Sequence, residues 1–285
     1  MKQRRIAVLM HEKDNERSKR HYLITYLAEH WREDGHTVTI LYGPRKFVPA
    51  DIIIVHVDLS VVPHEYLEFA ERYPRVVNGD VHDIRKSTYS PSLLTVDDTW
   101  PGGIIVKTNN NYAGIPERNR KITGEEKTIH EAALGSQQDP TIRYPRRPTE
   151  YPVFERLADV PRAYFDDPAF VVQKFIPELD HGLYCVRFVS FLGDRFSCFR
   201  LKGRHPIVNG TTAEETESGL DPHPEIMALR KQLHFDYGKF DYVVVNGQAI
   251  LLDANKTTGY SPNLIGNAAT IQERRERAKG LYAFF

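Results

Sequence analysis

Residues 239–255 read KFDYVVVNGQAILLDAN, a stretch that predicts a β-hairpin. Two apolar runs flank Asn246-Gly247, a dipeptide favoured in two-residue hairpin turns because both residues tolerate positive φ. Ideal pairing across this turn places Asp241 opposite Leu252, beside Asp253. Direct opposition of the two aspartates would therefore require a β-bulge or a diagonal approach.

Three side chains with oxygen atoms gather at the open end of this hairpin. Asp253 and Asn255 are two residues apart, so they share a face of their strand. Asp241 lies near them on the partner strand. Such oxygens suit Mg²⁺, which proteins usually hold with one or two carboxylates plus substrate phosphates. The hairpin suggests a magnesium site, although the same aspartates could simply end strands and cap turns.

Length and composition describe an ordinary globular protein of about two domains. The chain has 285 residues, and its 38 basic residues balance its 38 acidic ones. This balance argues against nucleic acid or a membrane surface as the default partner, and no apolar run approaches the ~20 residues of a membrane helix. The start of the chain does not resemble a signal peptide, and two cysteines, Cys185 and Cys198, make neither a disulfide scaffold nor a cysteine zinc site. We therefore expect a cytoplasmic protein.

The first eighty residues alternate between strand-like and helix-like patterns. Strands are predicted over 6–10, 37–42, 51–57 and 75–78, and helices over 17–34 and 63–73. This order suggests an open sheet with helices packed on it, in the Rossmann style. Its first strand–helix turn lacks the G-x-G-x-x-G fingerprint, which argues against a dinucleotide site there.

The pattern changes after about residue 85. Strands are predicted over 103–107, 169–176, 183–191 and 195–202, and helices over 224–234 and 270–281. Residues 117–150 are rich in charge, Pro and Gln. We expect an irregular insertion there, with a short helix near 125–134, that acts either as a lid or as a plain surface excursion.

Polar side chains interrupt or end several of these apolar strands. Lys107 ends the first, where an ammonium is costly to bury unless it meets an anion such as phosphate. Gln173 and Lys174 close the second, and Arg187 and Arg200 lie inside the next two. Taken singly, each has an ordinary explanation, such as a snorkelling lysine or an arginine on the wet face of a sheet.

Taken in order, the motifs resemble those of the ATP-grasp superfamily over nearly the whole chain, with D-alanine–D-alanine ligases and glutamate-adding ligases as the nearest well-known relatives. The residues that carry the resemblance are Arg85-Lys86, Lys107, 171–176, Arg187, Arg200, 240–242, 251–255 and 257–259. The resemblance implies a pre-ATP-grasp Rossmann-like α/β domain at 1–84. Two α+β lobes of the ATP-grasp domain would follow, at 85–177 and 178–285, the second carrying the metal site.

The resemblance also implies which residues bind the nucleotide. Lys86 and Lys107 would contact the phosphates of ATP from the first lobe. Gln173 and Lys174 would lie at the adenine edge, together with the backbone N–H of Ile176.

Further roles follow for the second lobe. Arg187 and Arg200 would be the catalytic cations that face the phosphates or an acyl-phosphate. Asp241, Asp253 and Asn255 would hold one or two Mg²⁺ ions between the phosphates.

Two departures from the family pattern concern the substrate. Relatives usually have Pro-Gly four residues after the Asn of the metal motif, whereas Asn255 is followed by Lys-Thr-Thr-Gly. The turn at 109–114, which would cover the triphosphate, is rich in Asn rather than Gly, although Asn tolerates left-handed conformations and can donate to phosphate. Candidates for substrate contact by position alone are His11, Glu12, Asp58, 78–83, Arg204, His205 and Ser261.

The family's usual reaction implies an ATP-dependent ligase that activates a carboxylate as an acyl-phosphate for attack by an amine. The expected partners are a small carboxylate and a small amine, and a homodimer is the common default assembly. Two other functions stay open: a phosphotransferase with a hydroxyl acceptor, and a nucleotide-binding protein without turnover. The complete set of Asp241, Asp253 and Asn255 argues against the last, because a pure binder does not need it.

Overall fold

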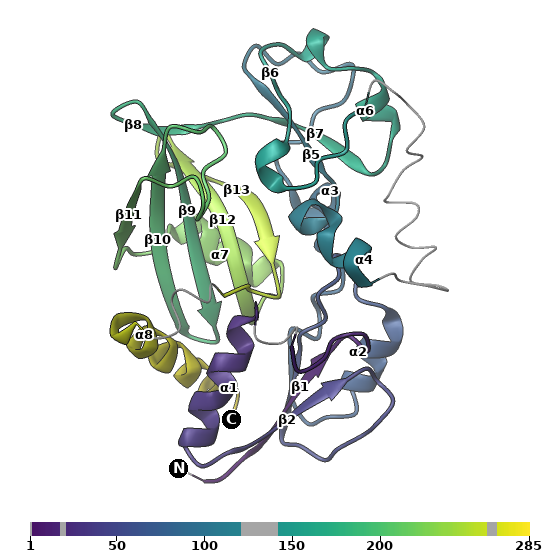
Figure 1. Ribbon diagram of the computed structural model, residues 1–285, viewed down its shortest axis with the longest axis vertical. Helices are drawn as coiled ribbons and strands as arrows, with labels where there is room; N and C mark the ends of the chain where they lie inside the picture. The colour runs from purple at the N-terminus through teal and green to yellow at the C-terminus, as the bar shows by residue number, and fades with distance from the viewer. Residues whose placement is uncertain (1, 18–20, 121–141, 261–266) are drawn as a thin grey trace.

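The computed structural model describes residues 2–17, 21–120, 142–260 and 267–285. Figure 1 shows three β-sheets with helices packed against them. The helix expected near 125–134 and the candidate Ser261 lie outside the described residues. Within those ranges, none of the helices has the length and apolar character needed to cross a membrane.

The first sheet has four parallel strands. They are β1 (Arg5–Met10), β2 (Thr37–Tyr42), β3 (Ile52–Val55) and β4 (Val76–Val77), in the order β2-β1-β3-β4. Helix α1 (Leu23–Glu33) buries Leu27 and Trp31 against one face, and α2 (His64–Ala70) buries Tyr66 against the other. Because both faces are covered, β3 is entirely apolar. The strand and helix order expected for this part of the chain is confirmed.

The second sheet has three antiparallel strands in the order β6-β5-β7. These strands are β5 (Ile104–Thr108), β6 (Val153–Phe154) and β7 (Phe170–Lys174). Short helical segments surround them: α3 (Lys86–Tyr89), η2 (Asn111–Gly114), α4 (Ile115–Arg120), η3 (Pro148–Glu150), η4 (Leu157–Asp159) and α6 (Ala163–Asp166). Ile104, Val106 and Phe170 form its buried core with Tyr164.

The third sheet has six antiparallel strands. Its main path is β11-β10-β9-β12-β13, and β8 pairs with β9. The strands are β8 (Glu178–Asp180), β9 (Leu183–Leu192), β10 (Arg195–Gly203), β11 (Glu215–Ser218), β12 (Tyr237–Val245) and β13 (Gln248–Asn255). Helix α7 (Pro224–Gln232) covers one face, where Ile226 packs with Phe240 and Tyr242. The short strands β6, β8 and β11 were not predicted, because each is too short to show a periodic pattern.

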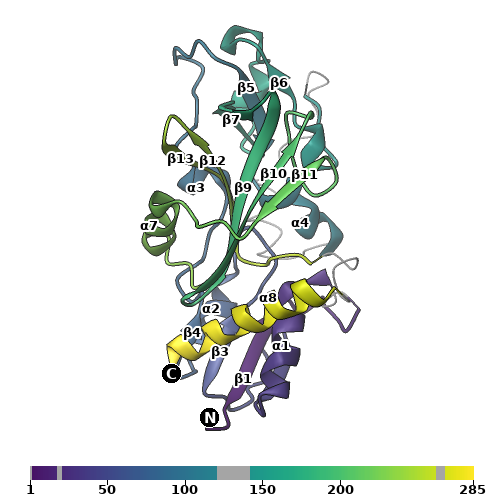
Figure 2. The same cartoon turned by 90° about the vertical axis from the view of Figure 1, so that its left-hand side faces the viewer.

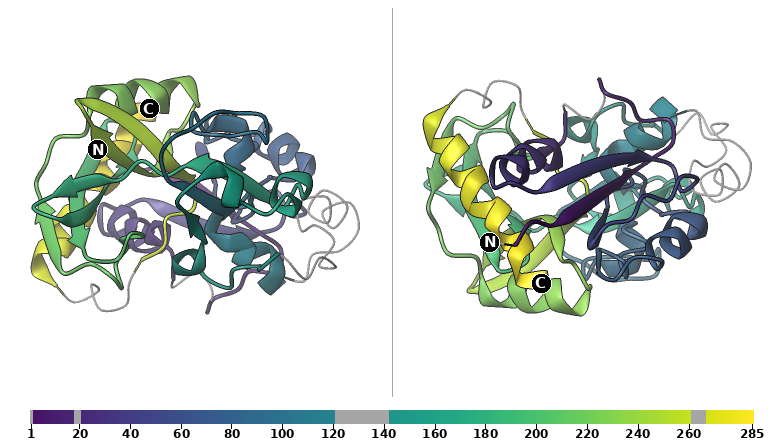
Figure 3. Two further views of the ribbon diagram at one scale, coloured as in Figure 1. Left: turned by 90° about the horizontal axis from the view of Figure 1, so that it is seen from above. Right: turned by 90° about the horizontal axis from the view of Figure 1, so that it is seen from below.

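The end of the chain returns to the first sheet. Helix α8 (Ala268–Ala278), followed by the 3-10 helix η6 (Lys279–Phe284), lies against α1 (Figures 2 and 3). Trp31 Nε1 donates to the carbonyl of Ala278 over 2.8 Å. Asn78, with φ of 60°, donates to the carbonyl of Tyr237 over 2.8 Å and accepts the backbone N–H of the same residue over 3.0 Å. The Asn78 bonds tie the end of β4 to the start of β12 and so connect the first and third sheets.

Candidate functional site

The hairpin β12–β13 brings two aspartates face to face. Its turn has the expected form, with φ of 53° at Asn246 and 79° at Gly247. Pairing follows the ideal register as far as Tyr242 opposite Leu251. It then shifts by one residue, so that Asp241 pairs with Asp253 and Leu252 forms a β-bulge. In an antiparallel pair, directly opposite Cβ atoms are about 4.5–5.5 Å apart.

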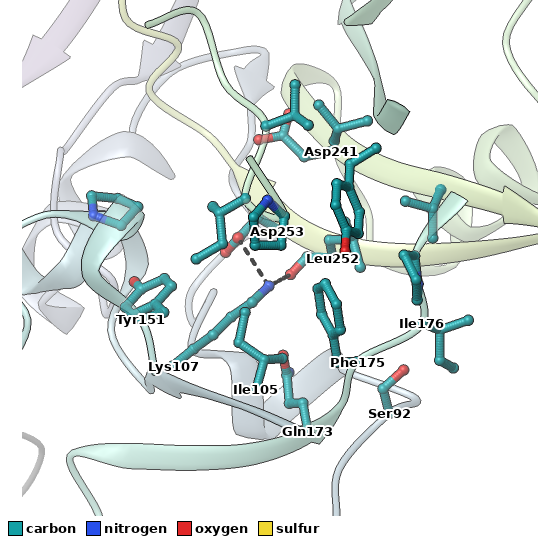
Figure 4. Close-up of a pocket in the computed structure, with 18 of the residues that line it drawn as sticks. Ser92, Ile105, Lys107, Tyr151, Gln173, Phe175, Ile176, Asp241, Leu252 and Asp253 are labelled. Carbon is teal, nitrogen blue, oxygen red and sulfur yellow. Dashed lines mark hydrogen bonds and ion pairs between the residues drawn. The ribbon is translucent and has the colours of Figure 1, made fainter. Parts of the chain in front are cut away.

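Three lysines neutralise this pair of carboxylates. Lys86 Nζ lies 2.8 Å from Asp253 Oδ1, and Lys107 Nζ lies 3.6 Å from Asp253 Oδ2. Lys239 Nζ lies 2.8 Å from Asp241 Oδ1. Lys86, in α3, and Lys107, in β5, are both buried. Figure 4 shows Lys107 pointing at Asp253. Three ammonium groups around two carboxylates leave the cluster with one excess positive charge, which favours an anion.

Burial and charge set the protonation of these groups. Burial alone would lower the pKa of Lys86, but the nearby Asp253 carboxylate raises it above its ordinary value. Burial lowers the pKa of Lys107, against the attraction of Asp253. Burial opposes the charge on Asp253, yet Lys86 and Lys107 hold its pKa below the usual range. Burial raises the pKa of Asp241 despite Lys239, so Asp253 is the more firmly ionised of the pair.

An apolar pocket opens beside the carboxylate pair, between β5–β7 and the hairpin. Its cavity is about 150 Å³, and its lining includes Ile105, Phe175, Ile176, Val186, Val243 and Leu251. Lys107, Asp241 and Asp253 line the same pocket (Figure 4). The predicted Gln173 and Lys174 also line it. Gln173 Nε2 donates to Ser90 Oγ over 2.8 Å, and Lys174 Nζ lies 4.9 Å from the centre of the Trp100 ring.

Of two further pockets, one contains the carboxylate pair and the other adjoins that pocket. The first, here the central pocket, is lined by Asp241 and Asp253 together with Arg118, Arg146 and Arg147. The second, here the polar pocket, shares Asn111, Lys239 and Asn255 with the central pocket. The aspartates therefore lie between an apolar compartment and a polar one.

The oxygen donors present fit Mg²⁺. Asp241 and Asp253 supply carboxylates. Asn255, the last residue of β13, lies on the same face of that strand as Asp253. Asn255 Oδ1 accepts the backbone N–H of Thr257 over 2.8 Å, which fixes the amide. In the described ranges no three His, Cys, Asp or Glu side chains cluster as metal ligands. An ion held by these residues would therefore need phosphate or water oxygens as well, as Mg²⁺ commonly does.

Arg187 and Arg200 do not join the carboxylate pair. Phe188 pairs with Asp241 in β9–β12, so the neighbouring Arg187 points to the opposite face of the sheet. Arg200 lies directly opposite Arg187.

Both arginines instead bind Glu178. The distance to a Glu178 oxygen is 2.8 Å from Arg187 Nη2 and 3.0 Å from Arg200 Nε. The Glu178 side chain is only 6% exposed and also accepts the backbone N–H of Val244 over 2.7 Å. The structure thus gives these two cations a buried carboxylate as partner, and their expected contact with phosphate stays a prediction.

The candidates named by position alone divide into two groups. Asp58 lines the polar pocket. His11 is buried against the Tyr66 ring, and Glu12 pairs with Arg45 over 2.8 Å. Arg204 lies 3.3 Å from Glu214, and His205 Nδ1 accepts the backbone N–H of Ile207. None of these four residues, and no residue of 78–83, lines the three pockets.

Sequence reasoning missed several residues of the site. Lys239 could have been found, because it is two residues before Asp241 and so shares its face. Arg146 and Arg147 carry no local signal, since only the packed chain places them in a pocket with the aspartates. The sequence left open whether a bulge or a diagonal approach would bring the aspartates together, and the structure has the bulge.

Comparison with known proteins bears on the fold. No protein-family model and no curated protein matches this sequence. Among solved structures, the chain is similar to a RimK domain protein ATP-grasp from Sphaerobacter thermophilus DSM 20745, with TM-score 0.50, 12% identity, and 98% of this chain and 99% of that chain covered.

It is also similar to D-alanyl-alanine synthetase A from Vibrio cholerae O1 biovar eltor str. N16961, with TM-score 0.51, 10% identity, and coverage of 99% and 97%. At these identities the likeness concerns architecture, and it spans nearly the whole of each chain. It agrees with the motif resemblance in the sequence. The chain therefore has the fold of the ATP-grasp superfamily.

Proposed function

We propose that this chain is an ATP- and Mg²⁺-dependent ligase that activates a carboxylate as an acyl-phosphate for attack by an amine. The observation that carries the proposal is the direct opposition of Asp241 and Asp253 beside an apolar pocket. An apolar pocket next to a cluster with excess positive charge suits a nucleotide, whose base is flat and whose phosphates are anionic.

The adenine would occupy the apolar pocket against Phe175 and Ile176, with Gln173 at its edge. The phosphates would lie toward Lys86 and Lys107, whose ammonium groups already converge on Asp253. Two buried lysines aimed at one point provide the fixed positive charge that a triphosphate requires.

Asp241, Asp253 and Asn255 would hold Mg²⁺, whose chemistry at such a site is to neutralise phosphate charge during transfer.

The same proposal divides the chain into three parts. Residues 1–84 would serve as the pre-ATP-grasp domain, 85–177 as the first lobe and 178–285 as the second. The separate parallel and antiparallel sheets support these boundaries.

The reaction needs no protein nucleophile. A carboxylate oxygen attacks the γ-phosphorus, the bond from that phosphorus to ADP breaks, and an acyl-phosphate forms. The neutral amine nitrogen then attacks the acyl carbon and the bond from carbon to phosphate oxygen breaks. An amide forms, and the proton that the nitrogen loses passes to the departing phosphate, which leaves as hydrogen phosphate. Lys86, Lys107 and Lys239 would hold the negative charge in place while the groups align.

A trapping assay tests the proposal. The protein is incubated with ATP, Mg²⁺ and pooled carboxylic acids, and hydroxylamine converts any acyl-phosphate to a hydroxamate. We expect hydroxamate and phosphate only when ATP and an acid are both present, and neither from Asp253→Asn. Transfer of phosphate to a hydroxyl compound without free phosphate would instead support a phosphotransferase, and nucleotide binding without any turnover would support a binding protein.

A further inference from the structure

The loop at 58–60 follows β3 and contacts other parts of the chain beside the site. The hydroxyl of Thr257 donates to Asp58 Oδ1 over 2.6 Å. The ammonium of Lys256 donates to the Leu59 carbonyl. Both bonds hold the segment that directly follows β13, at the end of that strand where the proposed metal ligands lie.

Ser60, the third residue of this loop, binds a different part of the chain. It is 1% exposed. Its N–H donates to Glu117 Oε1 over 2.7 Å, and its carbonyl accepts the N–H of Ile84 over 2.8 Å. Its Oγ accepts the backbone N–H of Asn111 over 2.8 Å. Ser60 therefore joins the loop after β3 to α4 and to the turn after β5.

The bond from Ser60 to Asn111 fixes a peptide group that also binds a lysine of the site. The N–H of Asn111 and the carbonyl of Asn110 belong to one planar peptide group, in which they point in opposite directions. That carbonyl accepts from Lys86 Nζ over 3.2 Å and from Thr108 Oγ1 over 3.0 Å. Ser60 thus binds one end of this peptide group, and Lys86 binds the other.

The backbone that follows this peptide group needs support from its surroundings. Tyr112 and Ala113 have φ of 48° and 56°, in the left-handed region that residues other than Gly rarely adopt. Such conformations persist where the surrounding structure holds them, and they cluster at functional sites. Asn111 and Tyr112 line both the polar pocket and the central pocket. A change in the support that Ser60 gives would therefore reach the pocket that contains the carboxylate pair.

We propose that Ser60 is a positioning residue of the nucleotide site, which acts on Lys86 through the 110–111 peptide group. This inference rests on the proposed function, in which Lys86 binds the phosphates. Lys86 Nζ lies 2.8 Å from Asp253 Oδ1, so one carboxylate and one carbonyl fix its ammonium, and Ser60 sets the direction of that carbonyl.

Loss of the Ser60 hydroxyl would release this arrangement. The N–H of Asn111 would be buried without an acceptor, which is costly, and the peptide group would rotate to find one. Lys86 would then lose the carbonyl that holds its ammonium in place. Charges that are fixed before the ligand arrives stabilise phosphate better than charges that must be reoriented.

The first test compares two ligands in Ser60→Ala. Affinity for adenylyl imidodiphosphate with Mg²⁺ should fall about tenfold, whereas affinity for adenosine, which has no phosphate for Lys86 to bind, should stay within about twofold. Competition calorimetry measures both affinities. A residue that only supports the fold would change both or neither. Ser197→Ala is the matched control, because the Ser197 hydroxyl accepts from the buried Arg277 and lines none of the three pockets, and it should change neither affinity.

An unchanged affinity of Ser60→Ala for the triphosphate analogue, or an equal fall for both ligands, would overturn this inference and leave the proposed function standing. Failure of the unaltered protein to bind the analogue would overturn the proposed function, and this inference with it.

A second measurement does not depend on any variant. Hydrogen–deuterium exchange of the unaltered protein compares peptides that cover 58–62 and 109–116, with and without adenylyl imidodiphosphate and Mg²⁺. We expect exchange to slow in both segments, because a nucleotide that fixes Lys86 also fixes the peptide group and its bond to Ser60. Slowing in 109–116 alone, or in neither segment, would overturn the inference.

Discussion

Asp241 lies directly opposite Asp253 because Leu252 is an extra residue in the pairing of β12 with β13. The same bulge turns the Leu252 carbonyl toward Lys107, whose Nζ donates to it over 3.3 Å (Figure 4). One irregular residue thus both aligns the two carboxylates and binds the lysine that faces them. Bulges are commonly found next to active sites, where they re-aim side chains.

Replacement of Lys107 tests its place at the phosphates. Lys107→Ala should weaken binding of adenylyl imidodiphosphate by about 1.5–3 kcal/mol, because a charge-assisted contact is lost. Isothermal calorimetry in the presence of Mg²⁺ measures the change. Lys231→Ala, at an exposed position of α7, is the control and should leave the affinity unaltered. Equal affinities in the two variants would remove Lys107 from the nucleotide site.

Metal binding should depend on the nucleotide. Lys86 and Lys239 each lie 2.8 Å from a carboxylate oxygen, so the aspartates are neutralised before any nucleotide arrives. A divalent cation alone would meet a site with excess positive charge. Titration of Mn²⁺, followed by electron paramagnetic resonance, should show binding at least about tenfold tighter with adenylyl imidodiphosphate than without it. Equally tight binding in both cases would contradict this prediction.

Arg187 should matter for stability more than for nucleotide affinity. Arg187→Met removes a partner of the buried Glu178 carboxylate, and we expect a loss of about 1–3 kcal/mol in the free energy of unfolding, with Arg200 limiting the damage. Urea denaturation measures this loss, and calorimetry should find nucleotide affinity within about twofold. A large loss of affinity at unchanged stability would return Arg187 to the phosphates, as its motif position predicted.

Lys256 should make stability depend on pH. Its buried ammonium donates to the Leu59 carbonyl, and burial, against the attraction of Asp58 and Glu117, lowers its pKa to about 8. Between pH 8 and the ordinary lysine value the unfolded chain binds the proton and the folded chain does not. Stability therefore rises with pH across that window.

Lys256→Met removes this dependence. From pH 7 to pH 10, the unaltered protein should gain about 2 kcal/mol in free energy of unfolding relative to the variant. Denaturant unfolding at the two pH values measures the difference. Parallel pH profiles would show that Lys256 stays charged in the folded protein.

Much of the fold could be predicted from local patterns. The all-apolar β3 and the amphipathic α1 each depend on residues close in sequence, as does the Asn246-Gly247 turn, and the structure confirms them. The short edge strands β6, β8 and β11 could not be predicted, because a few residues paired on one side leave no periodic signal.

The candidate site, like the fold, could be predicted from the sequence only in part. The sequence alone determined the kinds of group present: lysines that end apolar strands, and oxygen donors at the open end of a hairpin. Tertiary structure decided which of them meet. Lys86 contacts Asp253, although more than half of the chain separates the two residues in sequence. Glu178 binds Arg187 and Arg200 on the face of the third sheet opposite the aspartates. The physical reason is that strand patterns specify alternation within a strand, whereas the face that each residue presents to a neighbour depends on register and packing.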